Sequence, residues 1–96
     1  MVRLKWTNQA VEDLKNIKDF IANDSPHYAK ITVFKIRERS KLLKQFPRSG
    51  RVVPEIENNS IRELIEGHYR IIYRVLSKMK LIFLLCTTHQ DFLRGV

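Results

Sequence analysis

The sequence predicts an α+β domain in which a helical hairpin packs on a small twisted antiparallel sheet. In the first half of the chain, apolar residues recur at helical spacing in two segments separated by a short break. From residue 52 onward they form short runs typical of strands. A chain of 96 residues has room for one core. We therefore expect a single domain, 1–96, with the order β-α-α-β-β-β.

The N-terminal residues predict a short strand followed by a helix. Val2, Leu4 and Trp6 alternate with basic residues, as in a strand with one buried face. Thr7 or Asn8 can cap the helix, because a short side-chain oxygen accepts a hydrogen bond from a free backbone N–H there. We expect the helix over 9–23. Its predicted apolar face comprises Ala10, Leu14, Ile17 and Ile21, widened by Val11 and Phe20.

A second helix is expected from Pro26 to Gln45. Ser25 can cap it, and a proline at the first helical position gives up no hydrogen bond that the helix needs. The predicted buried face comprises Ala29, Val33, Ile36 and Leu43, with basic residues over much of the remainder. Two amphipathic helices joined by a short loop form an antiparallel hairpin.

Pro47 and Gly50 end the helical part of the chain, and strand-like runs follow. The runs are Val52-Val53, Ile61–Ile65, Tyr69–Leu76 and Met79–Thr88. Their spacing is typical of an antiparallel meander. Leu81–Cys86 has no polar face, so we expect an interior strand covered on both sides. Trp6, Tyr69 and Tyr73 fit the strand periodicity and are predicted to be core residues.

The charge balance favours an anionic partner. There are 18 Lys and Arg residues against 10 Asp and Glu, a net charge of +8, which attracts phosphate polymers or an acidic protein. The apolar run Leu81–Cys86 is far shorter than the roughly 20 residues of a membrane-spanning helix. The first residues interleave charge with apolar side chains, unlike a secretory signal, and a single cysteine allows no internal disulfide. We expect a cytoplasmic protein.

Several motifs in order along the chain resemble the RelE/ParE superfamily of toxins, which includes plasmid stabilisation proteins. They are Trp6-x-x-x-Ala10-x-x-Asp13-Leu14-x-x-Ile17, Asp24-Ser25-Pro26, Phe46-Pro47-x-x-Gly50-Arg51-x-x-Pro54-Glu55, Ile61-Arg62-Glu63-Leu64 and Tyr69-Arg70-Ile71-Ile72-Tyr73-Arg74-Val75. The resemblance implies the toxin of a type II toxin-antitoxin system, neutralised by a cognate antitoxin. Some members are endoribonucleases that cut mRNA on the ribosome, whereas ParE-type members poison DNA gyrase.

Cleavage of RNA without a metal requires a base, a group that stabilises charge on the phosphorus centre, and an acid. Arg62, Arg70 and His89 are the candidates, with Glu55 as a reserve base. Arginine suits the stabilisation of charge on the phosphorus centre, because its planar guanidinium donates two hydrogen bonds to phosphate oxygens. The alternative is that these strand arginines are solvated or paired with a neighbour such as Glu63.

The turn between the second and third runs decides whether Arg62 and Arg70 can act together. A two-residue turn at Glu66-Gly67 places them on opposite faces, whereas a loop that also includes His68 places them on one face. Catalysis requires the second case. The C-terminus also departs from many nuclease relatives, since Phe92 is the only aromatic residue near His89 and cannot transfer a proton.

Four basic residues are candidates for binding nucleic-acid phosphates: Lys41, Lys44, Arg48 and Arg51. The alternative is an ordinary solvated helix face. No metal or cofactor is expected, because Cys86 lies within an apolar strand without partner ligands and no glycine-rich phosphate loop is present. The sequence favours ribosome-dependent mRNA cleavage, with the ribosome and mRNA as partners. Gyrase poisoning and an inactive binding module are the alternatives.

Overall fold

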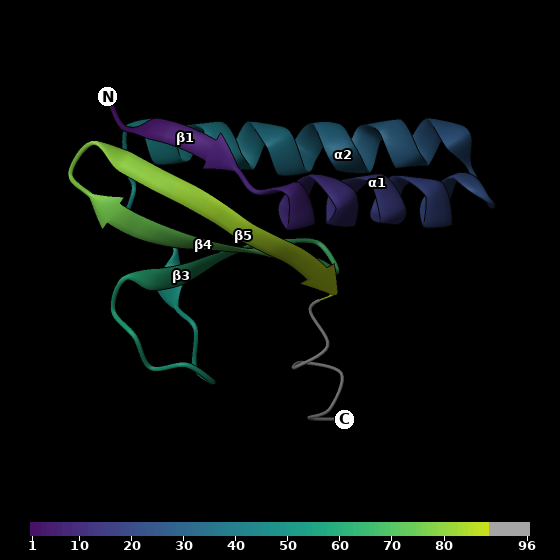
Figure 1. Ribbon diagram of the computed structural model, residues 1–96. Coiled ribbons are helices and arrows are strands. Elements are labelled where there is room, and N and C mark those ends of the chain that lie inside the picture. The colour runs from purple at the N-terminus through teal and green to yellow at the C-terminus, as the bar shows by residue number, and fades with distance from the viewer. Residues whose placement is uncertain (89–96) are drawn as a thin grey trace.

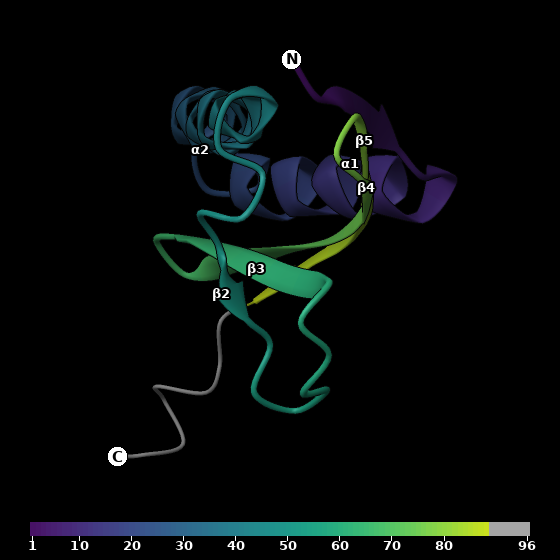
Figure 2. The same ribbon diagram turned by 90° about the vertical axis from the view of Figure 1, so that its left-hand side faces the viewer.

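The protein has two layers, with a helical hairpin over one face of a five-stranded sheet (Figures 1 and 2). The structure, a computed structural model, describes residues 1–88. Its elements are β1 (Arg3–Trp6), α1 (Asn8–Ala22), α2 (Pro26–Lys41), a 3₁₀ turn η1 (Leu42–Lys44), β2 (Arg51–Val52), β3 (Ile61–Glu66), β4 (Tyr69–Ser77) and β5 (Lys80–Thr88). The predicted α+β architecture is confirmed.

Both predicted helix starts are confirmed. The Thr7 side chain accepts a hydrogen bond from the backbone N–H of Ala10 at 3.1 Å and donates to the carbonyl of Phe83 at 2.8 Å. Thr7 therefore caps α1 and also ties it to β5. Ser25 caps α2 by accepting from the N–H of Tyr28. The second helix is shorter than predicted, because its last turn tightens into η1.

The strands lie in the order β1-β5-β4-β3-β2. β2 to β5 pair antiparallel, as predicted, but β1 runs parallel to β5. The rest of the fold connects these two strands, and a long connection is what parallel pairing requires. Leu84 is bulged out of the β4–β5 ladder, since Ile72 pairs with Leu85 and Tyr73 pairs with Phe83.

The core lies between the hairpin and the sheet. Ala10 and Leu14 of α1 and Ile36 of α2 pack there together with Leu43 of η1, against apolar side chains of β3, β4 and β5. The Trp6 ring stacks on Phe83 with ring centroids 4.1 Å apart. Tyr73 is fully buried, and Trp6 and Tyr69 are partly buried against the core.

The burial pattern differs from the prediction on α1, α2 and β5. Val11 and Phe20 are 53% and 73% exposed, because the sheet and α2 cover only a narrow face of α1. On α2, Thr32 and Ser40 occupy buried positions, where each hydroxyl donates to the carbonyl four residues earlier. The outer face of β5 is only partly buried, since the helices cover one side of the sheet.

None of the helices in residues 1–88 has the length and apolar character needed to cross a membrane.

Candidate functional site

The β3–β4 register separates the two candidate arginines. The turn consists of Gly67 and His68, and Gly67 has φ +59°, which glycine adopts without a steric penalty. Arg62 pairs with Tyr73, whereas Arg70 pairs with Ile65. Because side chains alternate along a strand, Arg62 lies on the face of Tyr73 and Arg70 on the other. The shared face that catalysis requires is therefore absent.

Arg62 binds the loops that flank the sheet. Its Nε donates to the carbonyl of Asn59 at 3.1 Å, and its Nη2 donates to the Asn59 side-chain oxygen at 2.8 Å. Its Nη1 donates to the carbonyls of Gly50 at 2.9 Å and Arg48 at 3.2 Å. All three nitrogens of the guanidinium thus donate within the protein. Through these hydrogen bonds Arg62 connects the segment before β2, at Arg48 and Gly50, with the segment before β3, at Asn59.

Arg70 belongs to an ionic cluster on the sheet face away from the helices, formed by Arg51, Glu55, Glu63 and Arg70. Its Nη2 and Nη1 donate to the two carboxylate oxygens of Glu55, at 2.8 and 3.3 Å. Nη1 also donates to Glu63 at 3.0 Å. The second oxygen of Glu63 accepts from Nε of Arg51. The Glu63 side chain has no exposed surface, and that of Arg70 is 14% exposed.

Register explains why these side chains meet. Arg51 pairs with Glu63 across β2 and β3, and Glu63 pairs with Ile72 across β3 and β4, so all three lie on one face. Arg70 lies two residues from Ile72 and shares that face. Glu55 reaches the cluster from the loop after β2. The cluster therefore joins three strands and a loop.

The ion pairs strongly perturb the carboxylate of Glu55. Its hydrogen bonds from Arg70 lower the pKa from 4.5 to about 2. The same contacts raise the pKa of Arg70, although burial opposes the shift. A carboxylate with so low a pKa is a weak base at neutral pH. Glu55 thus lies beside Arg70 but is poorly suited to remove a proton from a hydroxyl.

The four basic residues predicted to bind phosphates have different surroundings. Lys41 forms an ion pair with Glu38 at 2.9 Å, and Arg51 is paired with Glu63. Lys44 and Arg48 are exposed. The ionic cluster contains two guanidiniums and two carboxylates, so its formal charge is zero. His89, the remaining candidate, lies outside the described residues.

The structural role of Glu63 was not predicted from the sequence. Glu63 was identified only as a possible partner of a strand arginine, yet it lies between two of them. One signal was present in the sequence. Ile61, Glu63 and Ile65 share a strand face, so Glu63 occupies a position where the alternation predicts an apolar residue. A charge at such a position requires a partner.

Comparison with known proteins identifies the family. A family model described as "ParE toxin of type II toxin-antitoxin system, parDE" matches residues 4–92. The chain belongs to the ParE toxin family. A solved structure described as the chromosomal ParDE TA system from P. aeruginosa is similar to this ParE-family chain, with a TM-score of 0.75 and 31% identity. The alignment covers 92% of this chain and 96% of that one. A search of curated proteins gave no match.

The ParE family lies within the superfamily that the sequence motifs resembled, so that resemblance is confirmed. Two of these motifs have a clear structural role in this ParE-family chain. The Ile61-Arg62-Glu63-Leu64 motif supplies Arg62 and Glu63, and the motif that begins at Tyr69 supplies Arg70. The motif residues thus build the loop contacts and the ionic cluster described above.

Proposed function

We propose that this ParE-family chain arrests growth by poisoning DNA gyrase, that a cognate antitoxin neutralises it, and that it uses no catalytic step of its own. The observation that carries this proposal is the placement of the two arginines. Arg62 and Arg70 lie on opposite faces of the sheet, and protein oxygens bind both guanidiniums. Gyrase poisoning requires a binding surface and no reacting group.

Cleavage of RNA makes demands that this arrangement does not meet. The charge that develops on the phosphorus centre requires donors aimed at a single phosphate. Arg70 would have to leave both Glu55 and Glu63 to reach one, and Arg62 would have to release two loops. The low pKa of Glu55 also makes it a poor base. The geometry therefore favours the gyrase alternative over the mRNA cleavage that the sequence favoured.

The family assignment supports the same choice. The matched family is that of ParE toxins, and the similar solved structure is described as a ParDE TA system. ParE-type members of the superfamily poison gyrase, which makes gyrase the first proposed partner. The matched family is described as the toxin of a toxin-antitoxin system, and this description supports an antitoxin as the second partner. Both gyrase and mRNA are cytoplasmic, so either activity places the protein in the cytoplasm.

The proposal is tested by adding the purified protein to gyrase with relaxed plasmid, and in parallel to a translation reaction with a defined message. We expect loss of supercoiling and accumulation of cleaved plasmid, with the 5′ ends of the message unchanged. New 5′ ends with normal supercoiling would establish mRNA cleavage instead. No effect in either reaction would establish an inactive relative.

Arg70→Lys distinguishes a structural arginine from a catalytic one. Lysine keeps the positive charge beside Glu63 and Glu55 but cannot form a bidentate hydrogen bond with a phosphate. We expect the variant to inhibit gyrase as the parent does, provided that its circular dichroism and thermal unfolding show a folded protein. Arg74→Lys, on the exposed part of β4, is the matched control. Loss of toxicity in folded Arg70→Lys, with toxicity kept in the control, contradicts the structural role.

A further inference from the structure

Four basic side chains lie together on the sheet face that the helices leave uncovered (Figure 2). Three neighbouring strands, β1, β5 and β4, supply them, and these strands contain no acidic residue. All four side chains are exposed. We call this set the basic strand patch, and it consists of Arg3, Lys5, Arg74 and Lys80.

The register of the strands brings these side chains together. Arg3 pairs with Lys80. Lys5 and Arg74 flank Ile82, because both pair with it from neighbouring strands. Each basic residue is next in sequence to a side chain that packs in the core, so alternation directs it away from the helices. Strand spacing places the Cα atoms of Lys5 and Arg74 about 10 Å apart, and those of Arg3 and Lys5 about 7 Å apart.

Acidic groups do not neutralise the basic strand patch within the described chain. None of the ion pairs in residues 1–88 involves its four members. Glu55 and Glu63 lie on the same sheet face, but Arg51 and Arg70 already bind their carboxylates. The positive potential of the patch is therefore available to an anionic ligand.

The surface around the basic strand patch favours a nucleic-acid duplex. The aromatic side chains of the three strands all pack toward the core, namely Trp6, Tyr69, Tyr73 and Phe83. Single-stranded nucleic acid is usually held by stacking its bases on aromatic side chains, whereas contacts to a duplex backbone require cations alone. Ile82, at the centre of the patch, is partly buried, so the patch also lacks the apolar core of a protein interface.

We infer that the basic strand patch binds the phosphate backbone of double-stranded DNA without sequence preference. A duplex carries one negative charge per about 1.7 Å of its axis, so several phosphates face a patch of this size. The choice of DNA over RNA rests on the proposed function, because gyrase holds duplex DNA. On gyrase, these contacts favour binding of the toxin to the DNA-bound enzyme over the free enzyme.

The test measures binding of a short labelled DNA duplex by fluorescence anisotropy over a range of NaCl concentrations, without gyrase. Four phosphate contacts predict a slope of about −3.6 for the logarithm of affinity against the logarithm of salt concentration. In Lys5→Gln/Lys80→Gln, we expect this slope to become shallower by about 2. The dissociation constant at low salt should rise at least about tenfold, equally for duplexes of different sequence.

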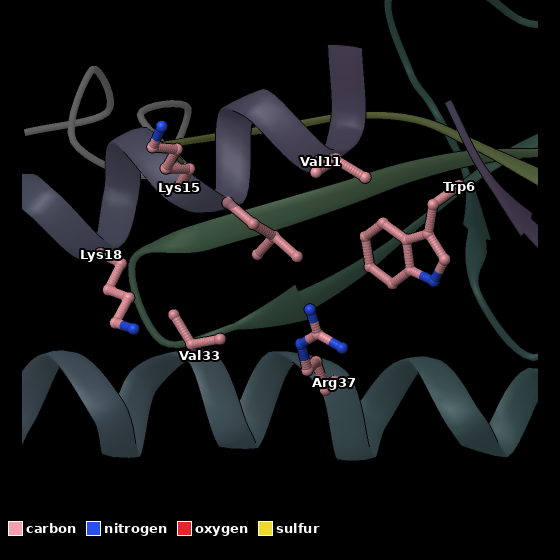
Figure 3. A pocket seen from close by; sticks show the side chains of 7 residues that line it. Trp6, Val11, Lys15, Lys18, Val33 and Arg37 are labelled. Carbon is pink, nitrogen blue, oxygen red and sulfur yellow. The ribbon is translucent and has the colours of Figure 1, made fainter. Parts of the chain in front are cut away.

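Lys15→Gln/Lys18→Gln is the matched control, since it makes the same change in net charge on the helical layer. Both lysines are exposed and lie beside a recess between α1 and α2, opposite Arg37 (Figure 3). Acidic residues of α1 lie among them, namely Glu12, Asp13 and Asp19. We expect this variant to keep the slope of the parent. Arg74→Lys retains its charge and should also bind as the parent does. Circular dichroism verifies that each variant is folded.

Several results overturn the inference. They are unchanged duplex binding in Lys5→Gln/Lys80→Gln, or equal weakening in the two double variants. Tighter binding of RNA or of single-stranded DNA, lost in Lys5→Gln/Lys80→Gln, would assign the patch to those ligands. Displacement of the duplex by polyglutamate of equal charge would assign it to an acidic protein.

A second readout uses gyrase and plasmid. We expect Lys5→Gln/Lys80→Gln to require a higher concentration than the parent to accumulate cleaved plasmid, and to bind DNA-free gyrase equally well. Equal potency of this variant and the parent would contradict DNA on gyrase as the ligand. Absence of cleavage by the parent, with duplex binding intact, would contradict the proposed function alone, so the two failures are distinguishable.

Discussion

The carboxylate of Glu63 is removed from water, and its two oxygens are bound by different arginines. Burial of a charge is unfavourable unless partners and hydrogen bonds compensate for the lost hydration. Here Arg51 compensates from β2 and Arg70 from β4, so one side chain links three strands. The cluster is thus a structural unit, and removal of its central acid affects both arginines.

Glu63→Ala is expected to lower the free energy of unfolding by about 3 kcal/mol, the usual result of breaking a buried ion pair. The partly buried Arg70 keeps Glu55 as a partner, which places the loss at the lower end of the range for such changes. Glu63→Gln retains an acceptor oxygen and should lose less. Urea denaturation measures both variants. An unchanged midpoint in Glu63→Ala would contradict the structural role of the cluster.

Glu55 is expected to make stability depend on pH in acid. Its pKa is lowered from 4.5 to about 2 on folding, so its ion pair stabilises the protein fully above about pH 4.5. That contribution is lost as the pH falls toward 2 and the folded form takes up a proton. Thermal unfolding between these two pH values measures the effect.

Glu55→Gln has no charge to titrate and should show a shallower fall of unfolding temperature with decreasing pH than the parent. Glu57→Gln is the matched control, since Glu57 is an exposed acid in the same loop and forms no ion pair within residues 1–88. If both variants followed the parent curve, the ion pair with Arg70 would not contribute to acid stability.

At the scale of elements, the start of α1 is coupled to the sheet. Thr7 accepts from Ala10 and donates to Phe83. Thr7→Ala is expected to destabilise the protein by about 1 to 2 kcal/mol, through loss of the cap and of the contact with β5. Thr7→Ser keeps the hydroxyl and should recover most of the loss. Ser25→Ala removes a cap with no contact to the sheet and should have a smaller effect, as measured by chemical denaturation.

Local signals were sufficient to predict the elements, but not the contacts between them. Thr7, Ser25 and Pro26 mark the helix starts through short-range chemistry, which is why the sequence located both helices to within a few residues. The β3–β4 turn illustrates the limit. A shift of one residue changes the face of every side chain in a strand, and the sequence allowed more than one turn at Gly67.

The candidate site was harder to predict for the same reason. The sequence pattern drew attention to Arg62 and Arg70, but their partners come from loops and strands up to 15 positions away. The distinction between a catalytic arginine and a structural one depends on which oxygens surround it, and that is set by tertiary packing. The grouping of Lys15 and Lys18 of α1 with Arg37 of α2 around one recess was not predicted, because each residue resembles an ordinary solvated helix position in the sequence.

At the scale of the whole molecule, the excess of positive charge opposes folding through self-repulsion. We expect the unfolding temperature to rise between about 10 and 150 mM NaCl, as the Debye length shortens from about 30 to 8 Å. Lys18→Gln removes one unpaired cation, so it should unfold at a higher temperature than the parent at low salt and respond less to salt. A fall in unfolding temperature with added salt would show that attractive pairs dominate instead.

The parallel pairing of β1 with β5 also bears on synthesis of the chain. Arg3 to Trp6 are synthesised well before Lys80 to Phe83, which are their partners in the sheet. While the ribosome is still translating the middle of the chain, β1 has no strand beside it, and α1 lacks the carbonyl that Thr7 binds. β1 and the start of α1 therefore reach their native contacts only after β5 has emerged from the exit tunnel, so the sheet cannot assemble progressively in the order of synthesis.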